Sequence, residues 1–105
     1  MKKLLLILFC LPVVVLAQQT YVPDDNFESY LEGNGMGDGI LFNDSVLTSN
    51  INTVTHLSVF AMNISDLTGI QDFSNLTHLM CDVNQLTFLD LTQNTALTYL
   101  ECWSN

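Results

Sequence analysis

The chain has 105 residues, of which 2 are Lys or Arg and 11 are Asp or Glu, giving a formal net charge of −9. A chain of this length forms one small domain at most. The charge argues against nucleic acids and anionic membrane surfaces as partners, because binding to phosphate groups requires Lys or Arg. Both basic residues, Lys2 and Lys3, stand at the N-terminus.

The N-terminal segment has the three parts of a secretory signal peptide. A basic start is followed by an apolar run over residues 4–16, and Ala17 ends a cleavage motif. The alternative is a transmembrane anchor, but the run has 13 residues, whereas a spanning helix needs about 20. We therefore predict a cleaved leader over residues 1–17 and a secreted or cell-surface protein. Without the leader the chain has no Lys or Arg, so it cannot place a basic side chain on a substrate anion.

Residues 18–53 precede a repeated pattern that begins at residue 54, and they are predicted to form the N-terminal cap of these repeats. Asp25 and Glu28 have the spacing of a capping box, in which the two side chains satisfy backbone N–H groups at a helix start. Apolar residues follow at helical spacing, and Gly33 is a natural stop. We therefore expect a short helix over residues 25–32 that covers the first repeat.

A loop and a strand are expected to follow this helix. Residues 34–44 are rich in Gly, Asn and Asp, as in calcium-binding loops. However, Met36 occupies a ligand position and no Glu closes the loop, which favours a plain turn over a calcium site. A strand is expected near Val46 and Leu47.

Residues 54–105 contain a repeated pattern. Three segments of the form L-x-x-L-x-[LC]-x-x-N begin at Leu76, Leu86 and Leu97, and Val54 begins a partial copy. The first and third segments are 21 residues apart, with the second half-way between. Alternating side chains direct two apolar positions inward, and stacked coils align them into ladders. The expected ladders are Leu57, Leu79 and Leu100, and beside them Val59, Cys81 and Cys102.

An asparagine closes each full motif, at Asn84, Asn94 and Asn105. A turn leaves backbone groups unpaired, and an asparagine side chain can hydrogen-bond them. Replacing a buried Asn84 with Ala is therefore predicted to cost about 1–3 kcal/mol of stability.

These motifs resemble the leucine-rich repeat family. Residues 63–70 are similar to an internalin-type repeat, and the nested units after them are similar to a variant of secreted Bacteroidetes surface proteins. Residues 21–55 resemble the N-terminal cap of such proteins. The resemblance implies an α/β-type repeat solenoid of short parallel strands behind a small helical cap. The pattern has no C-terminal cap, so we expect an incomplete array that is marginally stable or aggregation-prone by itself.

Two pairs of chemically reactive residues recur one period apart. Cys81 and Cys102 are expected on adjacent strands, where a disulfide is the alternative to two free thiols. Parallel side chains favour the free thiols. His56 and His78 are expected side by side, but Tyr99 takes the next position and no third ligand is evident, so we predict exposed residues rather than a metal site.

The motifs point to recognition rather than catalysis. The sequence contains no nucleophile motif, phosphate loop or paired metal motif, so we expect no enzyme activity and no cofactor. Repeat solenoids present an extended face to ligands. We predict a recognition or adhesion module that binds a protein or carbohydrate. The alternative is a structural spacer or targeting module of a larger secreted protein whose activity lies C-terminal to this region. The expected ligand-binding face consists of His56, Phe60, His78, Met80, Asp82, Tyr99, Glu101 and Trp103.

Overall fold

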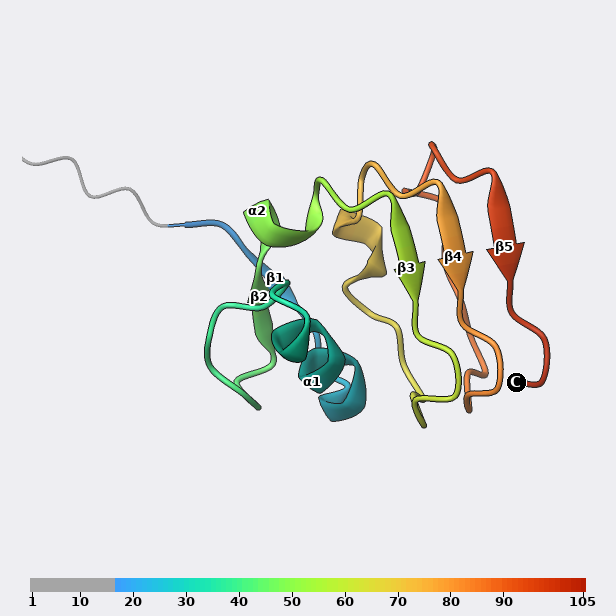
Figure 1. Ribbon diagram of the computed structural model, residues 1–105, viewed down its shortest axis with the longest axis horizontal. Coiled ribbons are helices and arrows are strands. Elements are labelled where there is room, and N and C mark those ends of the chain that lie inside the picture. Colours follow the sequence, from blue (N-terminus) through green and yellow to red (C-terminus); the bar gives the residue numbers. More distant parts are fainter. Residues whose placement is uncertain (1–16) are drawn as a thin grey trace, which may run out of the picture.

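The computed structural model describes residues 17–105, so the leader predicted over residues 1–17 lies almost wholly outside it. The described chain contains a two-stranded antiparallel sheet and a three-stranded parallel sheet (Figure 1). Within this part of the chain, no helix has the length and hydrophobicity needed to cross a membrane.

The cap contains the helix and strand that the sequence indicates, together with two elements that it does not. Strand β1 pairs antiparallel with β2, and Thr20 lies opposite Val46. The sequence did not indicate β1 or α2. In chain order the elements are β1 (Gln19–Tyr21), α1 (Asp25–Gly33), β2 (Ser45–Leu47), α2 (Thr48–Ile51), β3 (His56–Ser58), the 3-10 helix η2 (Ile70–Asp72), β4 (His78–Met80) and β5 (Tyr99–Glu101).

Helix α1 is capped by Asp24. Its Oδ1 atom accepts hydrogen bonds from the backbone N–H groups of Asn26 and Phe27, each at 3.0 Å. The predicted capping box of Asp25 and Glu28 is therefore wrong. The cap begins one residue earlier, and the acceptor that matters is an Asp in extended backbone conformation just before the helix.

The carboxylate of Glu28 hydrogen-bonds the loop that follows α1, and not the backbone at the start of the helix. Its side chain is fully buried on α1. Its carboxylate accepts hydrogen bonds from the backbone N–H groups of Asn43 and Asp44 at 3.1 and 3.0 Å. A buried carboxylate is tolerated when hydrogen bonds replace its lost hydration, and here the loop supplies them.

Polar contacts join the cap to the first repeat. The second oxygen of Asp24 accepts hydrogen bonds from the backbone N–H groups of Ser65 and Asp66 at 2.9 and 3.1 Å. The hydroxyl of Thr20 donates to Asp72 of η2 at 2.8 Å. One carboxylate thus caps α1 and fixes a turn that lies about 40 residues further along the chain.

Strands β3, β4 and β5 form the parallel sheet of the repeats (Figure 1). Leu57 pairs with Leu79, and Leu79 pairs with Leu100. This register confirms the predicted alignment of the coils. Leu57 and Leu79 are buried, whereas Leu100 is 42% exposed, because the coil that carries β5 packs on a neighbouring coil on one side only within the described chain.

A single apolar core runs through the cap and the repeats. The rings of Phe27 in α1 and Phe73 after η2 stack with centroids 6.3 Å apart. Burial of these side chains is the main stabilising contribution to the fold. The buried apolar residues are Val22, Phe27, Leu31, Val46, Ile51, Leu57, Val59, Ile64, Leu67, Ile70, Phe73, Leu76, Leu79, Cys81 and Leu86.

The turn asparagines hydrogen-bond the backbone, as predicted. The Oδ1 atom of buried Asn84 accepts hydrogen bonds from the backbone N–H groups of Met62 and Ile64 in the preceding coil, each at 3.0 Å. Asn105 repeats the arrangement one coil later, with its Oδ1 accepting from Leu86 N–H at 3.0 Å. The amide nitrogen of Asn84 donates to the carbonyls of Val59, Cys81 and Asp82 at 2.8, 3.0 and 3.2 Å.

Candidate binding face

The outward side chains of β3, β4 and β5, and of the positions just after them, form one surface that we call the strand face. Seven of the eight residues that the sequence indicates are its members: His56, Phe60, His78, Met80, Tyr99, Glu101 and Trp103. Side chains alternate along each strand, so the neighbours of buried Leu57 and Leu79 point away from the core. Phe60, Tyr99 and Trp103 are 49%, 44% and 57% exposed.

Three aromatic side chains form a stacked row across the strand face. The ring centroids of His56 and His78 are 4.2 Å apart with an interplanar angle of 14°. Those of His78 and Tyr99 are 5.4 Å apart at 27°. Both faces of the middle ring, His78, are covered, so this residue presents mainly its ring edge to a ligand, whereas His56 and Tyr99 are each stacked on one face.

Hydrogen bonds at the strand starts fix the orientation of His78. The hydroxyl of Thr77 donates its proton to the carbonyl of Thr55 at 3.0 Å. It also lies 2.8 Å from His78 Nδ1. This contact between a backbone-anchored hydroxyl and the ring orients the imidazole on the strand face.

Asp82 lies in the predicted row but is only 2% exposed. Backbone hydrogen bonds join the coil of Asp82 to the coil of Phe60 on one side and to the coil of Trp103 on the other. Asp82 therefore lies between these two residues in the stack of coils. Its Oδ1 accepts the backbone N–H of Trp103 at 3.0 Å. Asp82 therefore fixes the next coil and is not available on the surface, contrary to the expectation that it is part of the ligand-binding face.

Acidic groups perturb one another on this face. Burial raises the pKa of the Asp82 carboxyl, and contact with Glu101 raises this pKa further. The hydroxyl of Tyr99 donates to Glu101, and this hydrogen bond raises the pKa of Tyr99. The face is thus acidic and rich in hydrogen-bonding groups.

Replacing Asp82 with Asn should raise the melting temperature at pH 7 and leave it unchanged near pH 3. A carboxyl whose pKa is raised by folding stabilises the protein below its unfolded pKa of about 3.9, and this contribution is lost as pH rises through the folded pKa. Asn removes that loss and keeps the acceptor for Trp103 N–H. Thermal melts between pH 3 and 8 measure the effect.

Asp90 provides a control of opposite sign. Hydrogen bonds from Thr92 lower the pKa of the Asp90 carboxyl, so this group stabilises the fold at neutral pH and stops doing so in acid. Asp90→Asn should therefore lower the melting temperature at pH 7. A lower melting temperature for Asp82→Asn at pH 7 would contradict the raised pKa of the Asp82 carboxyl.

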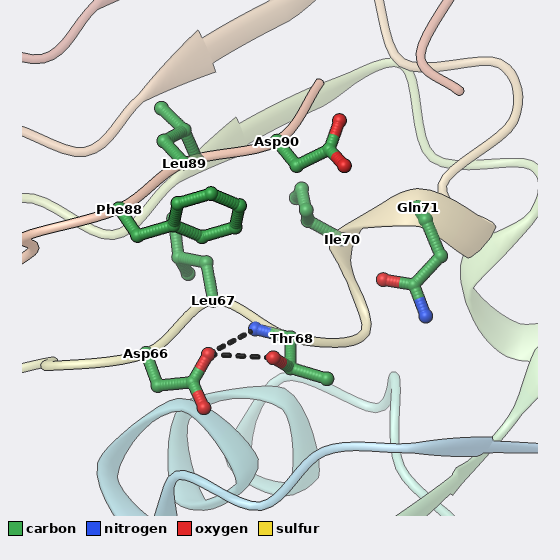
Figure 2. A pocket seen from close by; sticks show the side chains of 8 residues that line it. All are labelled: Asp66, Leu67, Thr68, Ile70, Gln71, Phe88, Leu89 and Asp90. Atoms are coloured by element: carbon green, nitrogen blue, oxygen red, sulfur yellow. Dashed lines mark hydrogen bonds between the residues drawn. The ribbon is translucent and has the colours of Figure 1, made fainter. Parts of the chain in front are cut away.

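A small pocket lies elsewhere and shares no residue with the strand face (Figure 2). Its volume is about 180 Å³. The carboxylate of Asp66 accepts hydrogen bonds from the backbone N–H and hydroxyl of Thr68 at 2.8 and 2.6 Å. This carboxylate oxygen therefore serves the turn, which favours a structural role. The lining residues are Asp66, Leu67, Thr68, Ile70, Gln71, Phe88, Leu89 and Asp90.

Both cysteines of the described chain are free thiols in adjacent coils. Cys81 is buried, and this burial raises its pKa to about 12. Cys102 is exposed. Because the thiolate is the reactive form, a thiol reagent at pH 8 should modify only Cys102 in the folded protein without residues 1–17, which include Cys10. After denaturation, both Cys81 and Cys102 should react. Absence of any reaction in the denatured, unreduced protein would reveal a disulfide.

Comparison with known proteins agrees with this geometry. No protein-family model matches the chain. Internalin J of Listeria monocytogenes is 40% identical over 75 residues, covering 71% of this chain and 8% of that protein. The solved functional domain of the same internalin superposes with a TM-score of 0.69 at 36% identity, covering 89% of this chain and 21% of that chain. The chain carries an internalin-like leucine-rich-repeat domain.

Other solved structures support the same internalin-like fold. Internalin C2 of Listeria monocytogenes has a TM-score of 0.66 at 27% identity, covering 86% of this chain and 41% of that chain. The internalin J domain includes a cysteine ladder. In this chain, Cys81 and Cys102 follow paired residues of β4 and β5, so they occupy equivalent positions in adjacent coils. The predicted fold class, a leucine-rich-repeat array of short parallel strands, is thereby confirmed.

Proposed function

We propose that this internalin-like domain is a non-catalytic recognition module, exported to the cell surface or medium, that binds a protein through the strand face. The supporting observation is the set of exposed aromatic side chains, Phe60, Tyr99 and Trp103, on a hydrogen-bonded ladder of strands. Aromatic residues held on a rigid support are favourable binding residues because they bury a large area at small entropic cost. The similarity to internalin domains favours the same function.

The geometry of the aromatic row favours a protein ligand over a carbohydrate. A sugar packs on the open face of an aromatic ring, but both faces of His78, the middle ring of the row, are covered by His56 and Tyr99. Their exposed edges offer hydrogen-bonding atoms, which suit a peptide surface. A carbohydrate is the second candidate because the side chain of Trp103 is 57% exposed. With acids and no Lys or Arg in residues 17–105, a neutral or cationic ligand is favoured.

A display experiment tests the proposal. The immobilised domain is screened against a displayed protein library and a glycan array, with Phe60→Ala plus Trp103→Ala as the test variant and Phe88→Ala as the control. Phe88 is 76% exposed but lies outside the strand face. We expect protein clones that the wild type and the control retain and the test variant loses. Clones retained equally by all three would show binding away from the strand face and contradict the proposal. No binding to either library would favour a spacer or targeting role, and binding only on the glycan array would favour a sugar ligand.

A further inference from the structure

The loop between α1 and β2 presents three consecutive apolar side chains to solvent. Ile40, Leu41 and Phe42, which we call the apolar tip, are 60%, 54% and 63% exposed. Figure 1 shows this loop extending from the cap on the side away from β3, β4 and β5. Contiguous exposed apolar side chains with polar neighbours are a mark of interaction sites. The apolar tip is therefore a surface separate from the strand face.

Carboxylates hold the loop that carries the apolar tip. Glu28 and Glu32 come from α1, and Asp38 belongs to the loop itself. A loop fixed before binding loses little conformational entropy when a partner docks. The three carboxylates accept hydrogen bonds of 2.8–3.1 Å from the backbone N–H groups of Asp38, Gly39, Ile40, Asn43 and Asp44.

Phe42 occupies a backbone conformation that does not suit it. Its φ angle is 59°, in the left-handed region. Bulky side chains are uncommon there, whereas Asn and Gly are favoured. A solvent-exposed phenylalanine gains little from burial to offset this strain. Strained residues of this kind cluster at functional sites, which is consistent with a binding role for the Phe42 side chain.

The charge near the apolar tip defines the partner. Asp38 and Asp44 flank the tip, and residues 17–105 contain no Lys or Arg. Anionic lipid and a second copy of the chain are disfavoured because both would bring negative charge against negative charge. We propose that the apolar tip is a second docking site, which binds a protein surface with an apolar pocket bordered by Lys or Arg.

Two synthetic helical peptides serve as probes for this site. They share the same leucine face and carry either Lys or Glu along its borders. We expect the Lys peptide to bind, with an affinity that falls as salt rises, and the Glu peptide not to bind. Phe42→Asn should lower the affinity for the Lys peptide at least tenfold. Asp44→Asn removes a bordering charge at a position with φ of 59°, and it should lower this affinity by a smaller factor. Affinities are measured by titration calorimetry.

Controls separate this site from general attraction to an acidic chain. Phe42→Asn should melt at or above the wild-type temperature, because Asn tolerates the left-handed region, so lost binding cannot be ascribed to unfolding. Phe88→Asn, which changes another exposed phenylalanine outside the tip, should bind the Lys peptide like the wild type. Phe60→Ala plus Trp103→Ala should also leave this binding intact, so the strand face and the apolar tip are tested independently.

Three results would overturn the proposal. The first is equal binding of the Lys peptide by the wild type and Phe42→Asn. The second is binding to phosphatidylcholine or phosphatidylglycerol vesicles that Phe42→Asn abolishes, which would assign the tip to a membrane. The third is a dimer in sedimentation experiments that the same variant dissociates, which would assign the tip to a second copy of the chain.

Discussion

Replacing Gly69 with Ala should destabilise the protein by about 2–5 kcal/mol. Gly69 has a φ of 110°, where a side chain strains the backbone. A Cβ atom there would lie 2.7 Å from a methyl carbon of Val22 and 2.9 Å from the carbonyl oxygen of Tyr21. Backbone strain contributes about 1–2 kcal/mol and overpacking about 1–3 kcal/mol. The clash is directed at the end of β1 and the residue after it, so the contact between the cap and the first repeat is affected.

Urea unfolding followed by circular dichroism measures this loss, and Gly33→Ala is the matched control. Gly33 is the last residue of α1, and a Cβ atom there meets nothing within 4 Å. Its replacement should change stability by less than about 1 kcal/mol, in the favourable direction, because Ala is the better helix former. Unfolding of both variants at the same urea concentration would show that a Cβ atom at Gly69 does not clash with Val22 and Tyr21.

Replacing Asn84 with Ala should cost about 2–6 kcal/mol, a range that extends above the one the sequence predicts. The side chain is 5% exposed and contacts backbone groups in two successive coils. Ala leaves the N–H groups of Met62 and Ile64 without the acceptor that Asn84 supplies, and each unsatisfied buried group costs about 1–3 kcal/mol. This is a large part of the 5–15 kcal/mol of stability that is typical of a small domain.

The neighbouring Gln85 provides the control for Asn84. Its side chain is exposed, so Gln85→Ala removes an amide of similar chemistry and should change stability by less than about 0.5 kcal/mol. The measurement is again equilibrium unfolding in urea. Similar unfolding midpoints for Asn84→Ala and wild type would show that the turn does not depend on this side chain.

The repeats could be predicted from the sequence because their determinants are local and periodic. Alternation fixes which side chains of β3 and β4 point inward, and the 21- or 22-residue spacing fixes the pairing of Leu57, Leu79 and Leu100. The asparagine turns follow from the same periodicity, as the contacts of Asn84 confirm.

The cap was predicted less completely because its contacts are long-range. Strand β1 has three residues, too few to show a pattern, and it exists because β2 pairs with it. Two adjacent aspartates both satisfy the sequence rule for a helix start, and only the structure distinguishes Asp24 from Asp25. The partners of Glu28 lie 15 and 16 residues away, beyond the reach of a local motif.

The strand face shows both the strength and the limit of pattern reading. Alternation placed His56 and His78 side by side, and the stacked rings confirm this placement. The same alternation placed Asp82 in the outward row without revealing that the side chain bends to the backbone of Trp103 and is buried. Direction follows from the sequence period, whereas accessibility depends on the neighbours in adjacent coils. The role of the face as a binding site stays a prediction.

The shared core has a consequence for exchanging parts among internalin-like proteins. Repeat proteins are commonly recombined by joining a cap to foreign repeats at a sequence boundary. A junction near residue 53 would separate Asp24 from Ser65 and Thr20 from Asp72, and it would leave Phe27 without Phe73. The smallest cassette that can be transferred from this protein therefore ends after the first repeat, so its cap and the adjoining coil should be exchanged together.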